Sequence, residues 1–212
     1  MKPFRRILLT FTLLAGICSS AAAQLLPSMD EPARAWAQNL SRGRDTDIDD
    51  VLQYLPLAAH MGLGALLPAR HELRDRVLLS MNASASMMAL VYSTKHIVRI
   101  PRPDNGRRNS FPSGHTAMAF MGAELVRAEY GNGYGAAAYA VAATTGFLRM
   151  YNDRHWLSDV LTGAAAGVLS ARVAYWLLPL ERRLLGWDGE QAALIVPYVA
   201  PRACGVSLAM TF

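Results

Sequence analysis

Five apolar stretches of helical length follow one another through the middle of this 212-residue chain. A sixth, Ile7–Ile17, follows the basic residues of the N-terminus. Their length and number predict an all-α bundle of five to six helices. Two β-like runs after Pro179, ALIVPYV and GVSLAMTF, predict a short C-terminal β-hairpin. The five stretches lie at about Val51–Leu67, Val77–Thr94, Thr116–Arg127, Gly135–Met150 and Ser158–Leu178.

The composition favours a membrane-embedded bundle. Hydrophobic residues make up 52% of the chain and charged residues 17%, so the chain is more apolar and less charged than the usual soluble domain. An Ala-rich soluble helical domain is the alternative, because the stretches lie near or below the roughly 17 to 25 residues that span a bilayer. With a cytoplasmic N-terminus, the basic loop Arg70–Arg76 and the pair Arg182–Arg183 fall on the same side. The loops around 95–113 and 150–157 then share the outer side.

The N-terminus has the layout of a secretory signal. A basic head precedes the apolar Ile7–Ile17, and the small residues Ala21–Ala23 precede Gln24. We therefore expect an inner-membrane protein with a periplasm-facing active site, or alternatively a soluble periplasmic protein. The expected regions are a signal peptide or first membrane helix at 1–23, an exported polar lead-in with a short helix around Trp36 at 24–50, the main domain at 51–180 and a C-terminal tail at 181–212.

The charged residues outside these stretches predict neither nucleic-acid binding nor a metal site. The net charge is +5, but the basic residues are scattered and form no nucleic-acid-binding motif. The acidic cluster Asp45–Asp50 lacks the ligand spacing and the glycine turn of a calcium loop, so we interpret it as a solvated helix start. No cofactor is expected.

Three clusters of polar residues lie at the ends of the apolar stretches, on the predicted outer side. Taken singly they have structural explanations, with Lys95 and Arg102 as snorkelling or headgroup-binding residues and Ser113 as a helix N-cap. Their convergence on one side favours a common site. The first cluster is Lys95–Pro103 (KHIVRIPRP), the second is Pro112–His115 (PSGH) and the third is Arg149–Asp159 (RMYNDRHWLSD).

These residue types suit a phosphoryl group, whose three oxygens gain and redistribute charge during transfer. Lys95 supplies a point charge, while Arg102 and Arg149 supply planar forks that contact two oxygens at once. Ser113 and the backbone N–H groups that follow it add neutral donors at a helix start. We therefore expect this group of residues to bind phosphate.

The two histidines of the clusters suggest a division of labour. His155 lies four residues before Asp159, which places both side chains on one helical face and lets the carboxylate hold one tautomer. Such a histidine can attack phosphorus and form a phosphohistidine, while His115 protonates the leaving oxygen. Water activated by His115 then releases phosphate, and these steps need no metal.

The spacing of the three clusters resembles that of the type 2 phosphatidic acid phosphatase (PAP2) family, which includes bacterial acid phosphatases and vanadium haloperoxidases. The matching residues are Lys95-x6-Arg102-Pro103, Pro112-Ser-Gly-His115 and Arg149-x5-His155-x3-Asp159. The resemblance covers about residues 51–180 and implies a PAP2-like helical bundle, either a six-helix membrane core or its soluble relative.

The resemblance also implies a role for each matching residue. His155 is the nucleophile, His115 the acid and base, and Asp159 orients His155. The implied phosphate-binding residues are Lys95, Arg102, Ser113, Gly114 and Arg149. There is one departure: a serine often precedes the arginine of the third motif, and this chain has Leu148 there. We expect one phosphate hydrogen bond to be lost for that reason.

The resulting prediction is a metal-independent phosphatase that hydrolyses a lipid phosphate or an isoprenoid diphosphate through a phosphohistidine. The alternatives are a soluble periplasmic non-specific acid phosphatase, a vanadate-dependent haloperoxidase and a non-catalytic anion- or lipid-binding membrane protein. The substrates that the resemblance implies are phosphatidic acid, phosphatidylglycerol phosphate, undecaprenyl diphosphate and a lipid A phosphate. Membrane lipids are the expected partners, and the sequence leaves the oligomeric state open.

Overall fold

The computed structural model describes residues 27–187, 193–200 and 203–210. The chain divides into two compact units, Met1–Ala174 and Tyr175–Phe212. The predicted leader at 1–23 lies outside the described residues.

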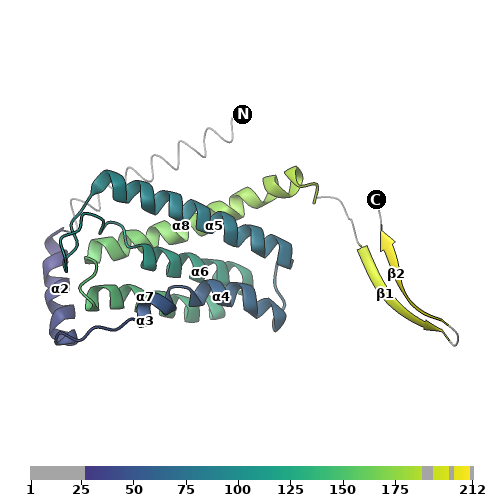
Figure 1. Cartoon of the computed structure of the whole chain (residues 1–212), viewed down its shortest axis with the longest axis horizontal. Coiled ribbons are helices and arrows are strands. Elements are labelled where there is room, and N and C mark those ends of the chain that lie inside the picture. Colours follow the sequence, from purple (N-terminus) through teal and green to yellow (C-terminus); the bar gives the residue numbers. More distant parts are fainter. Residues whose placement is uncertain (1–26, 188–192, 201–202, 211–212) are drawn as a thin grey trace. The chain divides into compact units, whose positions relative to one another are not determined.

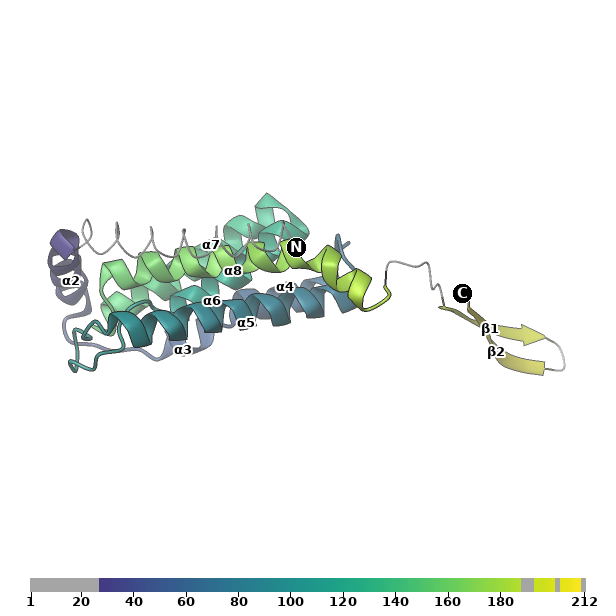
Figure 2. The same ribbon diagram turned by 90° about the horizontal axis from the view of Figure 1, so that it is seen from above.

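Helices build the first unit, and the last of them, α8, continues past its end at Ala174 (Figures 1 and 2). The long helices α5, α6, α7 and α8 run up and down along one direction, and α2 lies across the end where α5 and α7 finish and where α6 and α8 begin. This arrangement confirms the predicted all-α bundle. The bounds are α2 Pro27–Ser41, α3 Ile48–Leu52, α4 Leu55–Gly62, the 3-10 turn η1 Leu63–Ala65, α5 Leu73–Val98, α6 Gly114–Tyr130, α7 Asn132–Tyr151 and α8 Leu157–Leu184.

The first predicted stretch, Val51–Leu67, is not one helix. The chain ends α3 at Leu52, begins α4 at Leu55 and continues into the turn η1. Pro56 explains the new start, because proline has no N–H to donate to the preceding turn and fits the first turn of a helix. The 8 residues of α4 span only about 12 Å, whereas the hydrocarbon core of a bilayer is about 30 Å thick. The other four stretches lie inside α5, α6, α7 and α8.

Small side chains let the helices of the bundle approach closely. Ala119 and Ala123 of α6 and Ala142 of α7 belong to one buried apolar cluster. Gly167 of α8 lies so near α6 that a Cβ there would come within 2.2 Å of the carbonyl oxygen of Ala117. The close helix packing places the start of α6 directly beside the first turns of α8.

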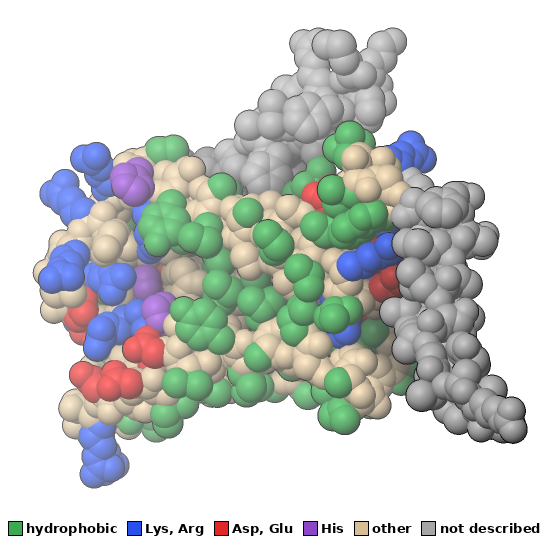
Figure 3. Space-filling model, turned by 45° about the vertical axis from the view of Figure 1, so that its right-hand side comes forward, with side chains coloured by type: hydrophobic (Ala, Val, Ile, Leu, Met, Phe, Trp, Pro, Cys, Tyr) green, Lys and Arg blue, Asp and Glu red, His purple; other side chains and the backbone are tan. Residues whose placement is uncertain are grey.

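Two helices among the described residues, α5 and α8, are long and apolar enough to cross a membrane. Exposed apolar side chains on α5 include Met81, Met88 and Tyr92. On the face shown in Figure 3, apolar side chains cover much of the middle of the molecule, while Lys, Arg, Asp, Glu and His side chains gather at the left end. This distribution is compatible with the predicted membrane location.

The second unit contains the predicted hairpin. Strand β1 (Ala193–Ala200) pairs antiparallel with β2 (Ala203–Met210). The register places Ala193 opposite Met210 and Ala200 opposite Ala203.

Candidate active site

The three clusters of the sequence meet at one end of the bundle. Lys95 lies in the last turn of α5, His115 in the first turn of α6 and Arg149 in the last turn of α7. His155 lies in the connection from α7 to α8, and Asp159 lies in the first turn of α8. Because successive helices reverse direction, these four helix ends share one side of the bundle, as the sequence predicted.

His155 and Asp159 form a buried pair. The imidazole Nδ1 lies 3.3 Å from Oδ2 of Asp159. The hydroxyl of Ser110 donates to the same carboxylate oxygen and lies 3.3 Å from Nδ1. The backbone N–H of Trp156 also donates to this oxygen, at 2.9 Å. Within the described residues, the side-chain hydrogen bonds of His155 are made at Nδ1, so Nε2 is the nitrogen left for a substrate.

Burial keeps the His155 ring neutral. Its removal from water lowers the pKa of His155 to about 4, and the positive charges of Arg149 and Lys95 act in the same direction. Asp159 opposes these effects without reversing them. The ring is therefore uncharged at neutral pH, which is the form that can attack an electrophile.

The cations of the first cluster are held by the segment that leads into the second. Lys95 Nζ donates to the carbonyl oxygens of Asn109 and Ser110 at 2.6 and 3.1 Å. Arg102 Nε donates to Oδ1 of Asn109 at 2.8 Å. Burial lowers the pKa of Arg102, and the charge of Arg149 lowers it further.

Ser113 is the N-cap of α6. Its Oγ accepts hydrogen bonds from the backbone N–H and the hydroxyl of Thr116, the latter at 2.9 Å. Its backbone N–H donates to the carbonyl oxygen of Asp159 at 3.0 Å. The N–H groups of Gly114 and His115 belong to the first turn of a helix, where no preceding carbonyl can bind them. They are the donors that this turn can offer to an anion.

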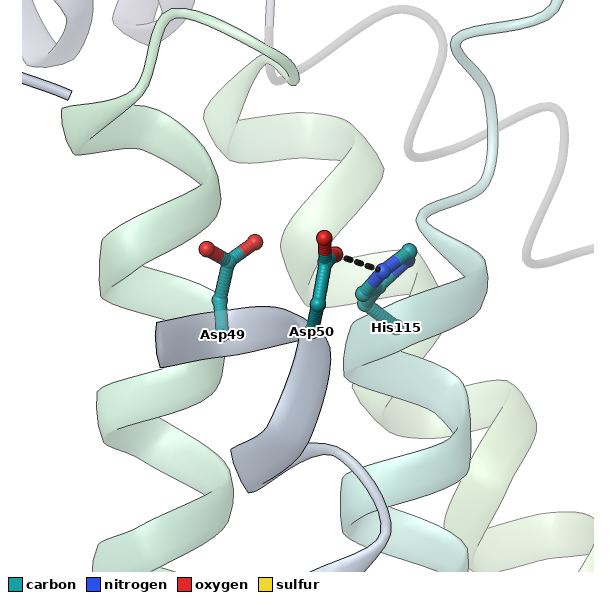
Figure 4. A group of neighbouring side chains, drawn as sticks. All are labelled: Asp49, Asp50 and His115. Carbon is teal, nitrogen blue, oxygen red and sulfur yellow. Dashed lines mark hydrogen bonds and ion pairs between the residues drawn. The ribbon is translucent and has the colours of Figure 1, made fainter. Parts of the chain in front are cut away.

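The acidic cluster reaches into the site, where the sequence had suggested a solvated helix start (Figure 4). Asp49 is only 1% exposed, and it accepts from Arg149 Nη1 at 2.5 Å and from Asn152 Nδ2 at 2.9 Å. Asp50 Oδ1 lies 2.8 Å from His115 Nε2 and 3.7 Å from Arg149 Nη1. The interpretation was wrong for Asp49, because the buried guanidinium of Arg149 compensates the cost of removing its carboxylate from water.

The same three side chains offer a potential metal-ligand set. Ligand atoms of Asp49, Asp50 and His115 lie within 4.8 Å of one another. However, Arg149 already supplies a positive charge to both carboxylates, at 2.5 and 3.7 Å. A divalent cation would have to lie against this guanidinium, so the donor set fits counter-ions of Arg149 and His115 better than a metal site.

Helix α2 holds the connection that carries His155. Asp30 accepts from the backbone N–H and the hydroxyl of Ser158, at 2.8 and 2.7 Å. Arg34 forms a two-pronged pair with Asp153, at 2.7 and 2.8 Å. These contacts brace both sides of His155 from a segment more than 100 residues earlier.

Sequence reasoning missed five residues of this end of the bundle. Ser110 stands three residues before the Ser-Gly-His turn, and only that proximity could have indicated it. No sequence signal joins the other four to their distant partners. The missed residues are Asp30, Arg34, Asp49, Asp50 and Ser110.

Comparison with known proteins gives a family match for this helical arrangement. Residues 102–183 match the model of the PAP2 superfamily. The match contains Arg102 and the whole of the second and third clusters, while Lys95 lies just before it. The resemblance predicted from the motif spacing is thus confirmed.

One curated relative is the lipid A 1-phosphatase of Porphyromonas gingivalis. This chain is 38% identical to it over 165 residues, which are 76% of this chain and 37% of the relative. The chain therefore matches well under half of the relative's length.

Two solved structures share the fold. The LpxE protein of Aquifex aeolicus superposes with a TM-score of 0.51 and 23% identity, over 67% of this chain and 93% of that one. A transmembrane PAP2-type phosphatidylglycerolphosphate phosphatase from Bacillus subtilis superposes with a TM-score of 0.56 and 20% identity, over 83% of this chain and 96% of that one. At these identities the likeness establishes the fold.

Proposed function

We propose that the chain is a PAP2-type phosphatase that removes phosphate from a membrane lipid through a phosphohistidine at His155. The observation that carries the proposal is the buried, neutral imidazole of His155, backed by Asp159 at the end of the bundle where three cations gather. Those cations are Lys95, Arg102 and Arg149. The match of residues 102–183 to the PAP2 superfamily supports the same assignment.

In the first step, Nε2 of His155 attacks the phosphorus atom of the substrate. The new N–P bond forms as the bond to the leaving oxygen breaks, and His115 gives a proton to that oxygen. Asp159 stabilises the positive charge that develops on the imidazole, since it holds Nδ1. Lys95, Arg102 and the N–H groups at the start of α6 balance the charge on the phosphoryl oxygens.

In the second step, water replaces the histidine. His115, now neutral, takes a proton from the water molecule, whose oxygen attacks the phosphorus atom. The N–P bond breaks, inorganic phosphate leaves, and His155 regains its lone pair. The protein's own groups complete the cycle, and no step requires a metal.

The leading substrate candidate is a lipid A 1-phosphate. The relative that is 38% identical over 165 residues carries the name lipid A 1-phosphatase, which supports this choice. Phosphatidylglycerol phosphate, undecaprenyl diphosphate and phosphatidic acid complete the panel. We propose that the site opens to the periplasm and to the outer edge of the inner membrane, where such phosphates lie.

Phosphate release from this panel by the purified full chain tests the activity. We expect turnover in EDTA and inhibition by vanadate, which resembles the transferred group. Loss of turnover in EDTA that magnesium restores would contradict the metal-free mechanism. Bromide oxidation by the vanadate-loaded protein would favour the haloperoxidase instead.

Trapping the intermediate tests the role of His155. Brief reaction with a 32P-labelled substrate, followed by denaturation in alkali, should leave label that acid removes, as expected for a phosphoramidate. His155→Ala should abolish both label and turnover. His96→Ala is the matched control, because His96 is exposed on α5 and its ring bonds its own helix at the Tyr92 carbonyl. Label that persists in His155→Ala would overturn the assignment.

A further inference from the structure

Helix α2 binds the protein through polar and small side chains and leaves three large apolar side chains exposed along one flank. The exposed fractions of Met29, Trp36 and Leu40 are 54%, 58% and 55%. These residues are spaced by seven and four positions, so they form one stripe along the helix. The inward stripe consists of Asp30, Ala33, Arg34, Ala37, Gln38 and Ser41. In water, a surface helix more often turns its large apolar side chains toward the protein.

The inward polar side chains Asp30, Arg34 and Gln38 all form hydrogen bonds to other segments. Asp30 and Arg34 bind the connection around His155, and Gln38 Nε2 lies 3.4 Å from the carbonyl oxygens of Met150 and Tyr151. Hydrogen bonds and an ion pair thus dock α2, while its large apolar side chains stay more than half exposed. The part of the chain that the structure describes leaves more than half of each of these three side chains exposed, so the stripe is a candidate surface for an apolar environment.

The position of α2 matches the surface of a bilayer. It lies across the ends of α5 and α8, the two helices that are long and apolar enough to cross a membrane (Figures 1 and 2). A helix that lies across spanning helices runs along the membrane plane. Arg42 and Arg44, both exposed, follow it directly and suit anionic headgroups.

The apolar stripe faces the hydrocarbon side of that plane. The Trp36 ring packs edge-on against Phe147 of α7, with 5.7 Å between the centroids. Phe147 lies one turn before Tyr151, where α7 ends. The stripe therefore faces the side of the bundle and not its end. The remaining exposed residues of α2, among them Glu31 and Asn39, lie on a different stripe that faces water.

We propose that α2 is a membrane-surface helix whose stripe Met29, Trp36 and Leu40 lies among the lipid headgroups and the upper acyl chains. This inference rests on the membrane location in the proposed function. Because the same helix braces the connection around His155, contact with lipid fixes the nucleophile at the depth where lipid phosphates lie.

Fluorescence quenching at two adjacent positions tests the proposal. In the full chain with Cys18→Ser and Cys204→Ser, Leu40→Cys and Asn39→Cys are each labelled with a small fluorophore. The protein is reconstituted in vesicles of anionic and zwitterionic phospholipid, with or without brominated acyl chains. We expect brominated lipid to quench the label at position 40 and aqueous iodide to quench the label at position 39.

A third position separates this proposal from the membrane location itself. Met88→Cys on α5 carries an exposed side chain near the middle of a candidate span. Quenching by brominated lipid at position 88 but not at 40 overturns the α2 proposal and leaves the membrane location standing. Quenching at neither position overturns both. Shielding of position 40 from iodide without quenching by lipid shows a protein partner or second copy on the stripe and also overturns the proposal. Met29→Cys repeats the test if Leu40→Cys fails to fold.

Discussion

Arg149 Nη1 donates to the buried carboxylate of Asp49 at 2.5 Å, across 100 residues of sequence. The side-chain amide of Asn152 donates to the other carboxylate oxygen, so both oxygens of Asp49 accept a hydrogen bond. Arg149 is only 4% exposed. Each buried charge is therefore the counter-ion of the other, and the acidic residue holds the arginine in place before substrate arrives.

Asp49→Ala should destabilise the protein strongly. The substitution leaves the guanidinium of Arg149 buried without a counter-ion, and breaking a buried pair in this way costs about 3 to 5 kcal/mol. Thermal unfolding in detergent should show a lowered midpoint, and vanadate should recover more of it than in the parent protein, because the anion replaces the lost charge. Asp47→Ala, at an exposed position of the same cluster, is the control. Equal midpoints for the two variants would contradict the pairing.

Asp50→Asn should move the alkaline limb of the kcat profile to lower pH. Burial and the charge of Arg149 lower the pKa of His115, while the hydrogen bond and charge of Asp50 raise it. Removing the carboxylate therefore lowers the pKa, so the acid loses its proton at a lower pH. The effect should be largest for substrates with poor leaving groups, which need the proton most. An unmoved limb would show that His115 does not act as the acid.

The acid limb of kcat/KM should lie well below the ordinary range of histidine. Burial lowers the pKa of His155 to about 4, so the ring stays neutral as the pH falls from 7 and takes up its proton only near that value. Protonation removes the lone pair that attacks phosphorus. Two substrates whose phosphates ionise differently separate the enzyme's limb from the substrate's own. A limb near pH 6.5, the ordinary value, would contradict the burial of the free nucleophile.

Gly163→Ala should impair the site through packing alone. A Cβ at Gly163 would lie 2.5 Å from the carbonyl oxygen of Ser113, so α8 or the Ser-Gly-His turn must shift. Such overpacking costs about 1 to 3 kcal/mol, and kcat should fall with the displaced turn. Gly133→Ala is the control, since a Cβ there meets nothing within 4 Å. Similar kcat values for both variants would argue against a rigid link between the second and third clusters.

Local patterns in the sequence were sufficient for the bundle and indicated the pairing of His155 with Asp159. The spacing of four residues suggested the pair through a shared helical face, but the structure places His155 in the connection before α8, so this explanation was wrong although the contact is present. The apolar stretches within α5 to α8 were visible in the local pattern. The break in the first stretch was also encoded locally, by Pro56, but the continuous apolar run around it concealed the signal.

The partners of Asp49 and Asp50 could not be predicted in this way. A short acidic segment before an apolar run is typical of a solvated helix start, and the same residues become buried only when α3 packs beside the ends of α6 and α7. Helix α2 is a similar case, because the role of its polar stripe becomes clear only when its partners Asp153 and Ser158 are known. Contacts between distant segments depend on the finished packing and leave no periodic pattern in the sequence.

The hydrogen bond from the Ser113 N–H to the Asp159 carbonyl, 3.0 Å long, joins the start of α6 to the start of α8 through main-chain atoms alone. This main-chain contact lies two residues before His115 and four residues after His155, so it helps to fix the distance between the two segments that carry the imidazoles. A transplant of the proposed site to another scaffold would therefore have to carry the two helix starts as one piece.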